Sequence, residues 1–128
     1  LIAESEVERN GEVYEFENGK KLAAKLVAAD PKPTAVLVIN DMTAYGVMQE
    51  LAYRGVRVPE DLSLVSFDNI FFSQITNPPL TTVSYSATEM GKLAAEFLIK
   101  KLTGSNTLQA NIILEPVLVE RASVRFCL

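Results

Sequence analysis

The stretch that decides the fold is PTAVLVINDMTAYGVMQELAYRGVRVPEDLSLVSFDNI, residues 33–70. It contains two short, mostly apolar runs, at 35–39 and 62–67. Runs of this length, bounded by turn residues, are typical of strands buried inside a parallel sheet. The segment between them carries apolar residues at helical spacing and stops at Gly55. Strand, helix and strand in this order predict a βαβ unit with a right-handed crossover.

The rest of the chain continues the same alternation. The patterns predict further strands at 1–8, 80–85 and 112–119, helices at about 17–29 and 87–102, and an irregular connection at 70–79. Ser86 followed by Glu89 forms a capping box, which marks the start of the last helix. Pro116 interrupts the last strand, so we expect it to be bent or to lie at a sheet edge. The predicted fold class is α/β, a parallel sheet flanked by helices.

The composition excludes several classes of function. With 128 residues, 48% of them hydrophobic, the chain can form one domain with a buried core. It contains no histidine and a single cysteine, Cys127, which excludes Ser-His-Asp and Cys-His nucleophile systems and the usual zinc ligand sets. Its six glycines form no phosphate-binding loop pattern. We therefore expect no enzymatic activity, no metal and no cofactor.

Charge and hydropathy patterning limit the partners. Lys and Arg number 12 against 16 Asp and Glu, a net charge of -4 without a basic stripe, so we expect this segment not to bind DNA by itself. No apolar stretch approaches the roughly 20 residues of a membrane helix, and no targeting segment is visible. A lone cysteine fits a reducing compartment, so we expect a cytoplasmic protein. The chain begins with Leu1, which suggests a piece of a longer protein.

Polar residues follow two neighbouring predicted strands. Ligands of open parallel sheets bind at the carboxyl ends of the strands, where Asn40 and Asp68 should converge on one crevice. Helix capping explains either residue singly equally well. A carboxamide and a carboxylate bind hydroxyls or ring nitrogens, and an aromatic residue such as Tyr14 or Tyr85 stacks on a sugar or purine. The pattern predicts a small polar ligand.

The helix that follows the first of these two strands has more apolar residues than one buried face requires. Tyr45, Met48 and Ala52 share one face, whereas Val47 and Leu51 share another. If one set faces the sheet, the other is exposed near Phe71, Phe72 and Ile75. This arrangement predicts a subunit interface, and the alternative is a helix buried on both sides.

Four segments together resemble the effector-binding domain of LacI/GalR-type bacterial transcription repressors. They are residues 33–70, NPPLTTV at 77–83, ATEMGKLAAEFL at 87–98 and LVERASV at 118–124, and the similarity covers roughly residues 11–125. The resemblance implies a type I periplasmic-binding-protein-like domain with two lobes, which closes on a sugar or purine-like effector. It also implies a cytoplasmic homodimer in which effector binding alters the operator affinity of an N-terminal helix-turn-helix.

The resemblance also assigns site residues. Asn40 and Asp68 match polar ligand contacts at two strand ends, Tyr14 matches an aromatic residue that packs on the effector, and Tyr85 lies where the chain crosses between the lobes. The dimer contacts of the family fall on Tyr45, Met48, Gln49, Ala52, Phe72 and Ile75.

The same resemblance divides the chain between two lobes. Residues 1–85 would belong to the C-terminal lobe, 86–116 to the N-terminal lobe, and 117–128 to the C-terminal lobe again, with the DNA-binding domain outside this sequence. The apolar face of the helix 87–102, formed by Met90, Leu93, Ala94 and Phe97, would then need another partner, and we expect these residues to associate or swap elements.

Two other functions remain open from the sequence. An exported solute-binding protein of a transporter shares the fold, and the NDxxAxG motif at 40–46, followed by a strand that ends in Phe67 and Asp68, also occurs in periplasmic sugar-binding proteins. A receiver-like phosphoacceptor or Mg²⁺-dependent enzyme would also place carboxylates at strand ends.

Overall fold

The computed structural model describes residues 15–104 and 111–126. The strand predicted at 1–8, Tyr14 and Cys127 lie outside the described residues. The elements are α1 (Glu15–Ala28), β1 (Ala35–Leu37), α2 (Asp41–Tyr53), β2 (Ser63–Phe67), η1 (Phe71–Gln74), β3 (Thr81–Ser84), α3 (Ala87–Leu102) and β4 (Val117–Val119). Within these ranges the alternation of strands and helices is the predicted one, and the α/β class is confirmed.

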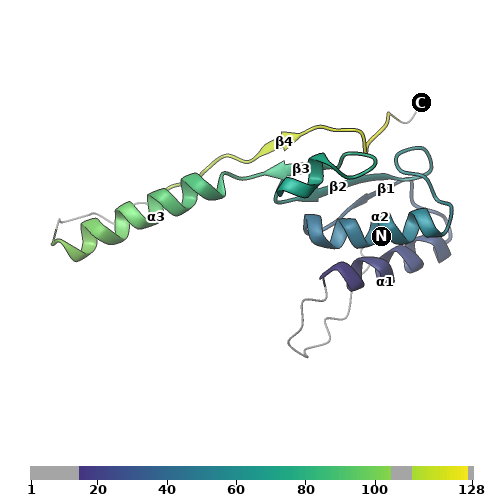
Figure 1. Ribbon diagram of the computed structural model, residues 1–128, viewed down its shortest axis with the longest axis horizontal. Coiled ribbons are helices and arrows are strands. Elements are labelled where there is room, and N and C mark those ends of the chain that lie inside the picture. Colours follow the sequence, from purple (N-terminus) through teal and green to yellow (C-terminus); the bar gives the residue numbers. More distant parts are fainter. Residues whose placement is uncertain (1–14, 105–110, 127–128) are drawn as a thin grey trace.

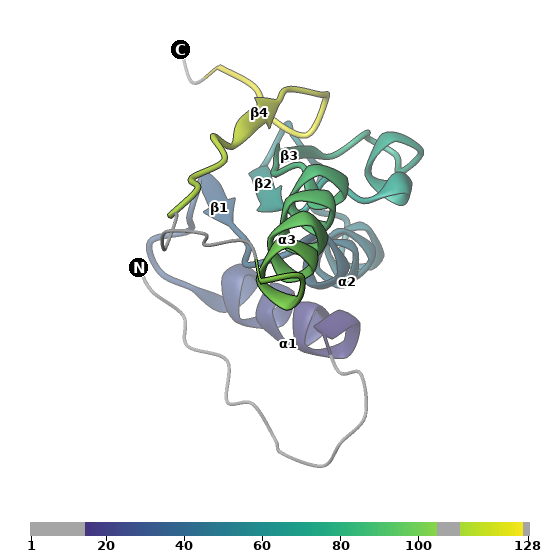
Figure 2. The same cartoon turned by 90° about the vertical axis from the view of Figure 1, so that its left-hand side faces the viewer.

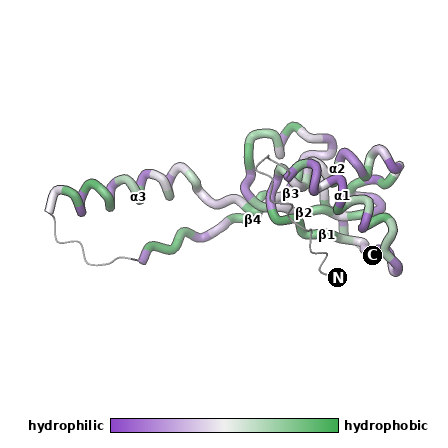
Figure 3. Tube along the Cα trace, turned by 90° about the horizontal axis from the view of Figure 1, so that it is seen from below, coloured by the Kyte–Doolittle hydropathy of each residue, from purple (hydrophilic) through white to green (hydrophobic). Residues whose placement is uncertain are grey.

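The sheet is mixed rather than wholly parallel. Its order is β1-β2-β3-β4, in which the first three strands are parallel and β4 is antiparallel to β3 (Figure 1). The segment before β4 runs toward the sheet from the side of α3, so β4 enters the sheet in the direction opposite to β3 (Figure 3). Of the strand predicted at 112–119, only Val117–Val119 pairs, and it forms the edge that Pro116 predicts.

The core lies between the sheet and the two helices that follow its lower face in Figure 1. Helix α2 packs against β2, and α1 packs against α2 (Figure 2). The buried hydrophobic residues are Ala23, Val38, Ala44, Val47, Met48, Leu51, Leu62, Leu64 and Leu80. Because α2 is covered by both the sheet and α1, much of it is buried on two sides, which was the alternative to the predicted interface helix.

Two glycines set the close approach of α1 and α2. A Cβ atom on Gly19 would lie 2.1 Å from the backbone oxygen of Thr43, and one on Gly46 would lie 1.9 Å from that of Phe16. Real Cβ atoms never come so close to a backbone oxygen. The pair therefore fixes the distance between the two helices, on which the position of α2 under the sheet depends.

Substituting Gly46 by alanine should destabilise the protein by about 1 to 2 kcal/mol. Overpacking costs about 1 to 3 kcal/mol, and the better helix propensity of alanine returns up to about 1 kcal/mol. Urea unfolding of wild type and Gly46→Ala measures the difference. Gly91→Ala is the matched control, because no atom lies within 4 Å of the added Cβ in α3, and it should leave stability unchanged or raise it. Equal effects of both substitutions would contradict a steric role for Gly46.

Helix α3 projects from the body of the molecule (Figure 1). Its N-cap Ser86 accepts the backbone N–H of Glu89 at 3.3 Å, as the capping box predicts. None of its residues is buried, and Met90, Leu98, Ile99 and Leu102 are exposed. Of the predicted apolar face, Leu93 and Phe97 are half-buried and Ala94 is exposed. Among the described residues, no helix is both long enough and apolar enough to cross a membrane.

Candidate functional site

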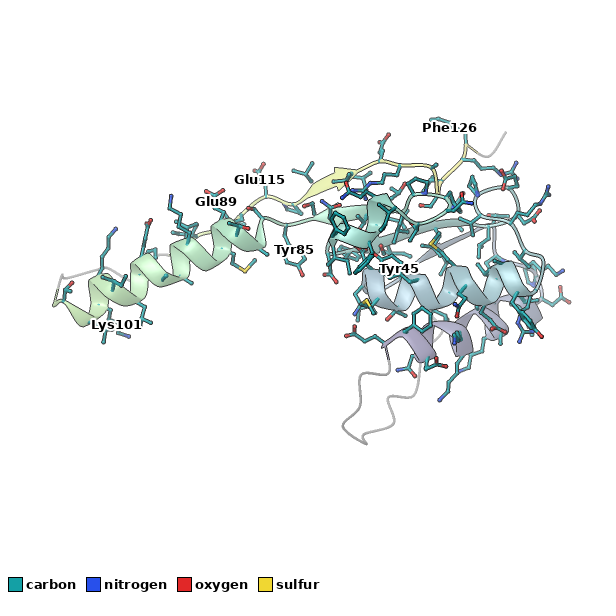
Figure 4. All side chains as sticks on the ribbon, in the orientation of Figure 1. Tyr45, Tyr85, Glu89, Lys101, Glu115 and Phe126 are labelled. Atoms are coloured by element: carbon teal, nitrogen blue, oxygen red, sulfur yellow. The ribbon has the colours of Figure 1, made fainter. Side chains whose placement is uncertain are left out.

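Three neighbouring strands bring the predicted ligand residues to one edge of the sheet. Asn40 and Asp68 each lie three positions beyond the paired residues Leu37 and Val65, so they leave β1 and β2 at the same level. The backbone N–H of Asp68 donates to the carbonyl of Val83 at 2.9 Å, which brings in the end of β3. Tyr85 follows that end (Figure 4). Ligands of open α/β sheets bind at this edge.

Asp68 lies in a strained turn and contacts Tyr85 directly. The φ angles of Asp68 and Asn69 are 110° and 53°, a region that non-glycine residues rarely adopt, at a cost of about 1 to 3 kcal/mol each. The Tyr85 hydroxyl donates to Oδ1 of Asp68 at 2.7 Å. Within the described part of the chain, the second carboxylate oxygen makes no hydrogen bond and is available to a ligand.

Asn40 also caps a helix. Its Oδ1 accepts the backbone N–H of Thr43 at 2.8 Å, so it is the N-cap of α2. The capping interpretation is therefore confirmed for its oxygen. In the described residues its Nδ2 makes no hydrogen bond, which leaves a donor at the same edge as the free acceptor of Asp68. A donor and an acceptor side by side suit a ligand with several hydroxyl or ring-nitrogen groups.

A buried carboxylate lies beneath this edge. Asp41 is 0% exposed, and its Oδ1 accepts the hydroxyls of Ser66 and of Thr82, the latter at 2.7 Å. Its Oδ2 accepts the Ser73 hydroxyl and the backbone N–H of Ile70, the latter at 2.9 Å. Asp41, which follows Asn40 directly, was not among the predicted ligand residues. The missed signal is the presence of two serines, Ser63 and Ser66, at buried positions of β2, of which Ser66 contacts Asp41.

Arg121 was also missed by the sequence reasoning. Its guanidinium donates to the carbonyl of Leu80 at 2.6 Å and to Oδ1 of Asn69 at 2.7 Å. The Nδ2 of Asn69 donates to the hydroxyl of Ser84 at 3.3 Å. The Asn69 side chain is thus fixed at both of its ends, from β3 and from the segment after β4. No periodicity or spacing in the run that follows Val119 marks Arg121 as a contact of Asn69.

The predicted interface residues divide into exposed and buried ones. Gln49, Ala52, Phe72 and Ile75 are exposed, the last two by 56% and 60%. Met48 is only 9% exposed and packs in the core. Tyr45 is half-buried and its hydroxyl lies 2.8 Å from the Ser73 hydroxyl, while burial raises its pKa above the ordinary value (Figure 4). The apolar surface therefore centres on η1 rather than on Met48.

The hydrogen bond to Asp68 raises the pKa of Tyr85 above 10.0, and the negative charge of Asp68 acts in the same direction. The bond should therefore favour the folded state below pH 10.0 and be lost as the pH rises through the folded-state pKa. NMR titration of the tyrosine Cζ signals, with Tyr85→Phe for assignment, should show this raised pKa. It should fall toward 10.0 in Asp68→Asn, and an unchanged pKa in that variant would contradict the contact.

The chain is similar to a known domain family and to two bacterial repressors. The sequence model of the periplasmic binding protein-like domain matches residues 2–124. The chain is 38% identical over 112 residues to the HTH-type transcriptional repressor PurR of Pasteurella multocida, which covers 88% of this chain and 34% of that protein. It is 34% identical over 111 residues to the ribose operon repressor of Haemophilus influenzae, covering 87% and 33%. The chain spans about one third of the length of these relatives.

Solved structures are similar over the same part. A LacI family transcriptional regulator from Enterococcus faecium with bound ribose has a TM-score of 0.80 at 27% identity, covering 85% of this chain and 40% of that chain. The regulator CelR in complex with cellobiose has a TM-score of 0.78 at 29% identity, covering 84% and 33%.

Proposed function

Because the chain belongs to the family of periplasmic binding protein-like domains, we propose that it is the effector-sensing part of a bacterial transcription regulator of the LacI type. The observation that carries this proposal is the convergence of Asn40, Asp68 and Tyr85 at the carboxyl edge of β1, β2 and β3. The two curated relatives are repressors and the two solved structures are transcriptional regulators, which favours a regulator over a transporter component or an enzyme.

The effector is a sugar or a purine-like molecule. The free oxygen of Asp68 accepts a hydroxyl or ring N–H, the Asn40 amide donates to a ligand oxygen or nitrogen, and Tyr85 borders the same edge. Tyr14 completes the proposed set as an aromatic surface. Ribose and cellobiose in the two related structures support the sugar class.

Sensing works by a shift between conformations. The effector binds one arrangement of two lobes better than the other, and this difference in affinity alters operator binding by a DNA-binding region of the longer protein. In this assignment 1–85 and 117–128 belong to one lobe and 86–116 to the other. The projection of α3 away from the sheet agrees with that division (Figure 1). The regulator acts in the cytoplasm, where its operator is.

A screen of the complete protein tests the proposal. A library of pentoses, hexoses, disaccharides and purine bases is screened by thermal shift, and each ligand that binds is then tested for its effect on operator binding by fluorescence anisotropy. We expect at least one sugar or purine to raise Tm and to change operator affinity. A ligand that raises Tm without any effect on DNA binding would support the transporter component instead, and a screen without a single sugar or purine ligand would reject the proposed effector class.

We expect the complete regulator to be a homodimer that uses the η1 surface, formed by Phe71, Phe72 and Ile75. Phe71 and Phe72 pack edge to face with ring centroids 5.8 Å apart, and all three residues are exposed. Phe72→Glu should shift the protein from dimer to monomer in sedimentation at micromolar concentration, because a charge would be buried in an apolar interface. The matched control is Phe126→Glu, since Phe126 is 95% exposed. A dimer that survives Phe72→Glu places the interface elsewhere.

A further inference from the structure

Hydrogen bonds to buried residues hold the strained turn that contains Asp68. Asp68 itself has a single side-chain hydrogen bond among the described residues, the one to Tyr85. Its positive φ, and that of Asn69, therefore depend on contacts made by the residues around it. A carboxylate that must face a ligand from such a turn needs this support, because an unfavourable backbone conformation persists only where its surroundings enforce it.

Asp41 is linked to the two residues that follow Asp68. Its Oδ1 accepts the Thr82 hydroxyl at 2.7 Å, and the oxygen of that hydroxyl accepts the backbone N–H of Asn69 at 3.3 Å. Its Oδ2 accepts the backbone N–H of Ile70 at 2.9 Å and the hydroxyl of Ser73. The residues immediately after Asp68 are thus tied to one buried carboxylate, either directly or through a single hydroxyl.

Asp41 is suited to this role by its burial and its fixed position. It is 0% exposed, and it starts α2 directly after the N-cap Asn40. Hydrogen bonds to a buried carboxylate are stronger than those between neutral groups. The same helix start therefore presents Asn40 to the edge and anchors the turn that presents Asp68.

We propose that Asp41 is a positioning residue of the effector site, which holds the Asp68–Asn69 turn so that the Asp68 carboxylate faces the ligand. This inference rests on the proposed function, because it concerns the same site. It adds a residue that does not touch the effector. It also explains why a buried acid lies under a sheet edge whose surface residues alone would suffice to contact a sugar.

The Tyr85 titration tests the positioning without any ligand. If Asp41 holds the turn, loosening the link should separate Asp68 from Tyr85 and bring the Tyr85 pKa down toward 10.0. Asp41→Asn is the direct variant, but it also removes a nearby negative charge that raises the same pKa. Thr82→Val keeps that charge and removes only the hydroxyl between Asp41 and Asn69. Thr82→Val also tests the positioning role if Asp41→Asn does not fold.

Ser123→Ala is the matched control. Ser123 is 0% exposed, and its hydroxyl donates to the carbonyl of Leu64 at 2.6 Å and accepts the backbone N–H of Thr81 at 2.8 Å. Ser123→Ala therefore removes a buried hydroxyl comparable to that of Thr82, and it leaves the hydrogen bonds of the Asp68–Asn69 turn in place. We expect the Tyr85 pKa to fall in Thr82→Val and to stay raised in Ser123→Ala. A pKa that stays raised in Thr82→Val, or that falls equally in both variants, overturns the positioning role.

A second arm measures affinity in the complete protein with D-ribose as the probe. We expect Thr82→Val to weaken ribose binding about tenfold and Ser123→Ala to leave it unchanged. Equal affinities in wild type and Thr82→Val would overturn the positioning role. If the wild type does not bind ribose, ribose is rejected as the effector, and the Tyr85 titration alone decides the role of Asp41.

Discussion

Replacing Asp68 by alanine in the complete protein should weaken effector binding by about 1 to 3 kcal/mol, which is roughly 5- to 150-fold in affinity. In the proposed site the free oxygen of Asp68 accepts a hydroxyl or N–H of the effector, and its loss leaves that donor without its acceptor. Isothermal titration with a ligand from the thermal-shift screen measures the effect. Asp68→Asn keeps the size of the side chain and one acceptor oxygen, so it should show a smaller loss.

Asp61→Ala is the matched control for this prediction. Asp61 is also an aspartate, but it precedes β2 at the opposite end of the strand and pairs with Arg57 at 2.9 Å. Hydrogen bonds from Arg57 lower its pKa to about 2, so it stays charged at neutral pH. We expect effector affinity to be unchanged in this variant. Wild-type affinity in Asp68→Ala would move the effector site away from this sheet edge.

The sheet edge could be predicted from the sequence because it depends on local pattern and one rule of topology. Two apolar runs ending in Asn40 and Asp68 predict parallel strands, and parallel strands end at the same edge. The placement of Tyr85 followed in the same way from the end of the third run. This rule of sheet topology says nothing about hydrogen bonds between side chains, so it could not predict that the Tyr85 hydroxyl contacts Asp68.

The support beneath the edge could not be predicted, because it joins residues distant in the sequence. Ser66, Ser73 and Thr82 lie 25, 32 and 41 positions after Asp41, and no periodicity relates them. The direction of β4 was missed for a similar reason. It depends on how α3 leaves the sheet, whereas the residues of Val117–Val119 only indicate a strand.

Asp41→Asn should lower the free energy of unfolding by about 2 to 6 kcal/mol, because two buried donors lose their acceptor at a cost of about 1 to 3 kcal/mol each. The carboxylate accepts four hydrogen bonds with its two oxygens. Asparagine offers one oxygen, and its NH₂ group would face two of the donors. Urea unfolding of the complete protein measures the loss, which should appear as a lower midpoint with an unchanged m-value.

Asp61→Asn is the matched control, because it shows whether the loss comes from the hydrogen-bond network of Asp41 or from the removal of a negative charge alone. Asp61→Asn removes the same charge from an exposed aspartate, so its effect should stay within about 0.5 kcal/mol. If Asp41→Asn cost as little, the four donors would be satisfied in some other way, and the turn of Asp68 would not depend on Asp41. If the loss is large but Thr82→Val leaves the Tyr85 pKa raised, Asp41 stabilises the fold without positioning Asp68. A large loss together with a lowered Tyr85 pKa in Thr82→Val means that one buried carboxylate both stabilises the domain and orients its effector site.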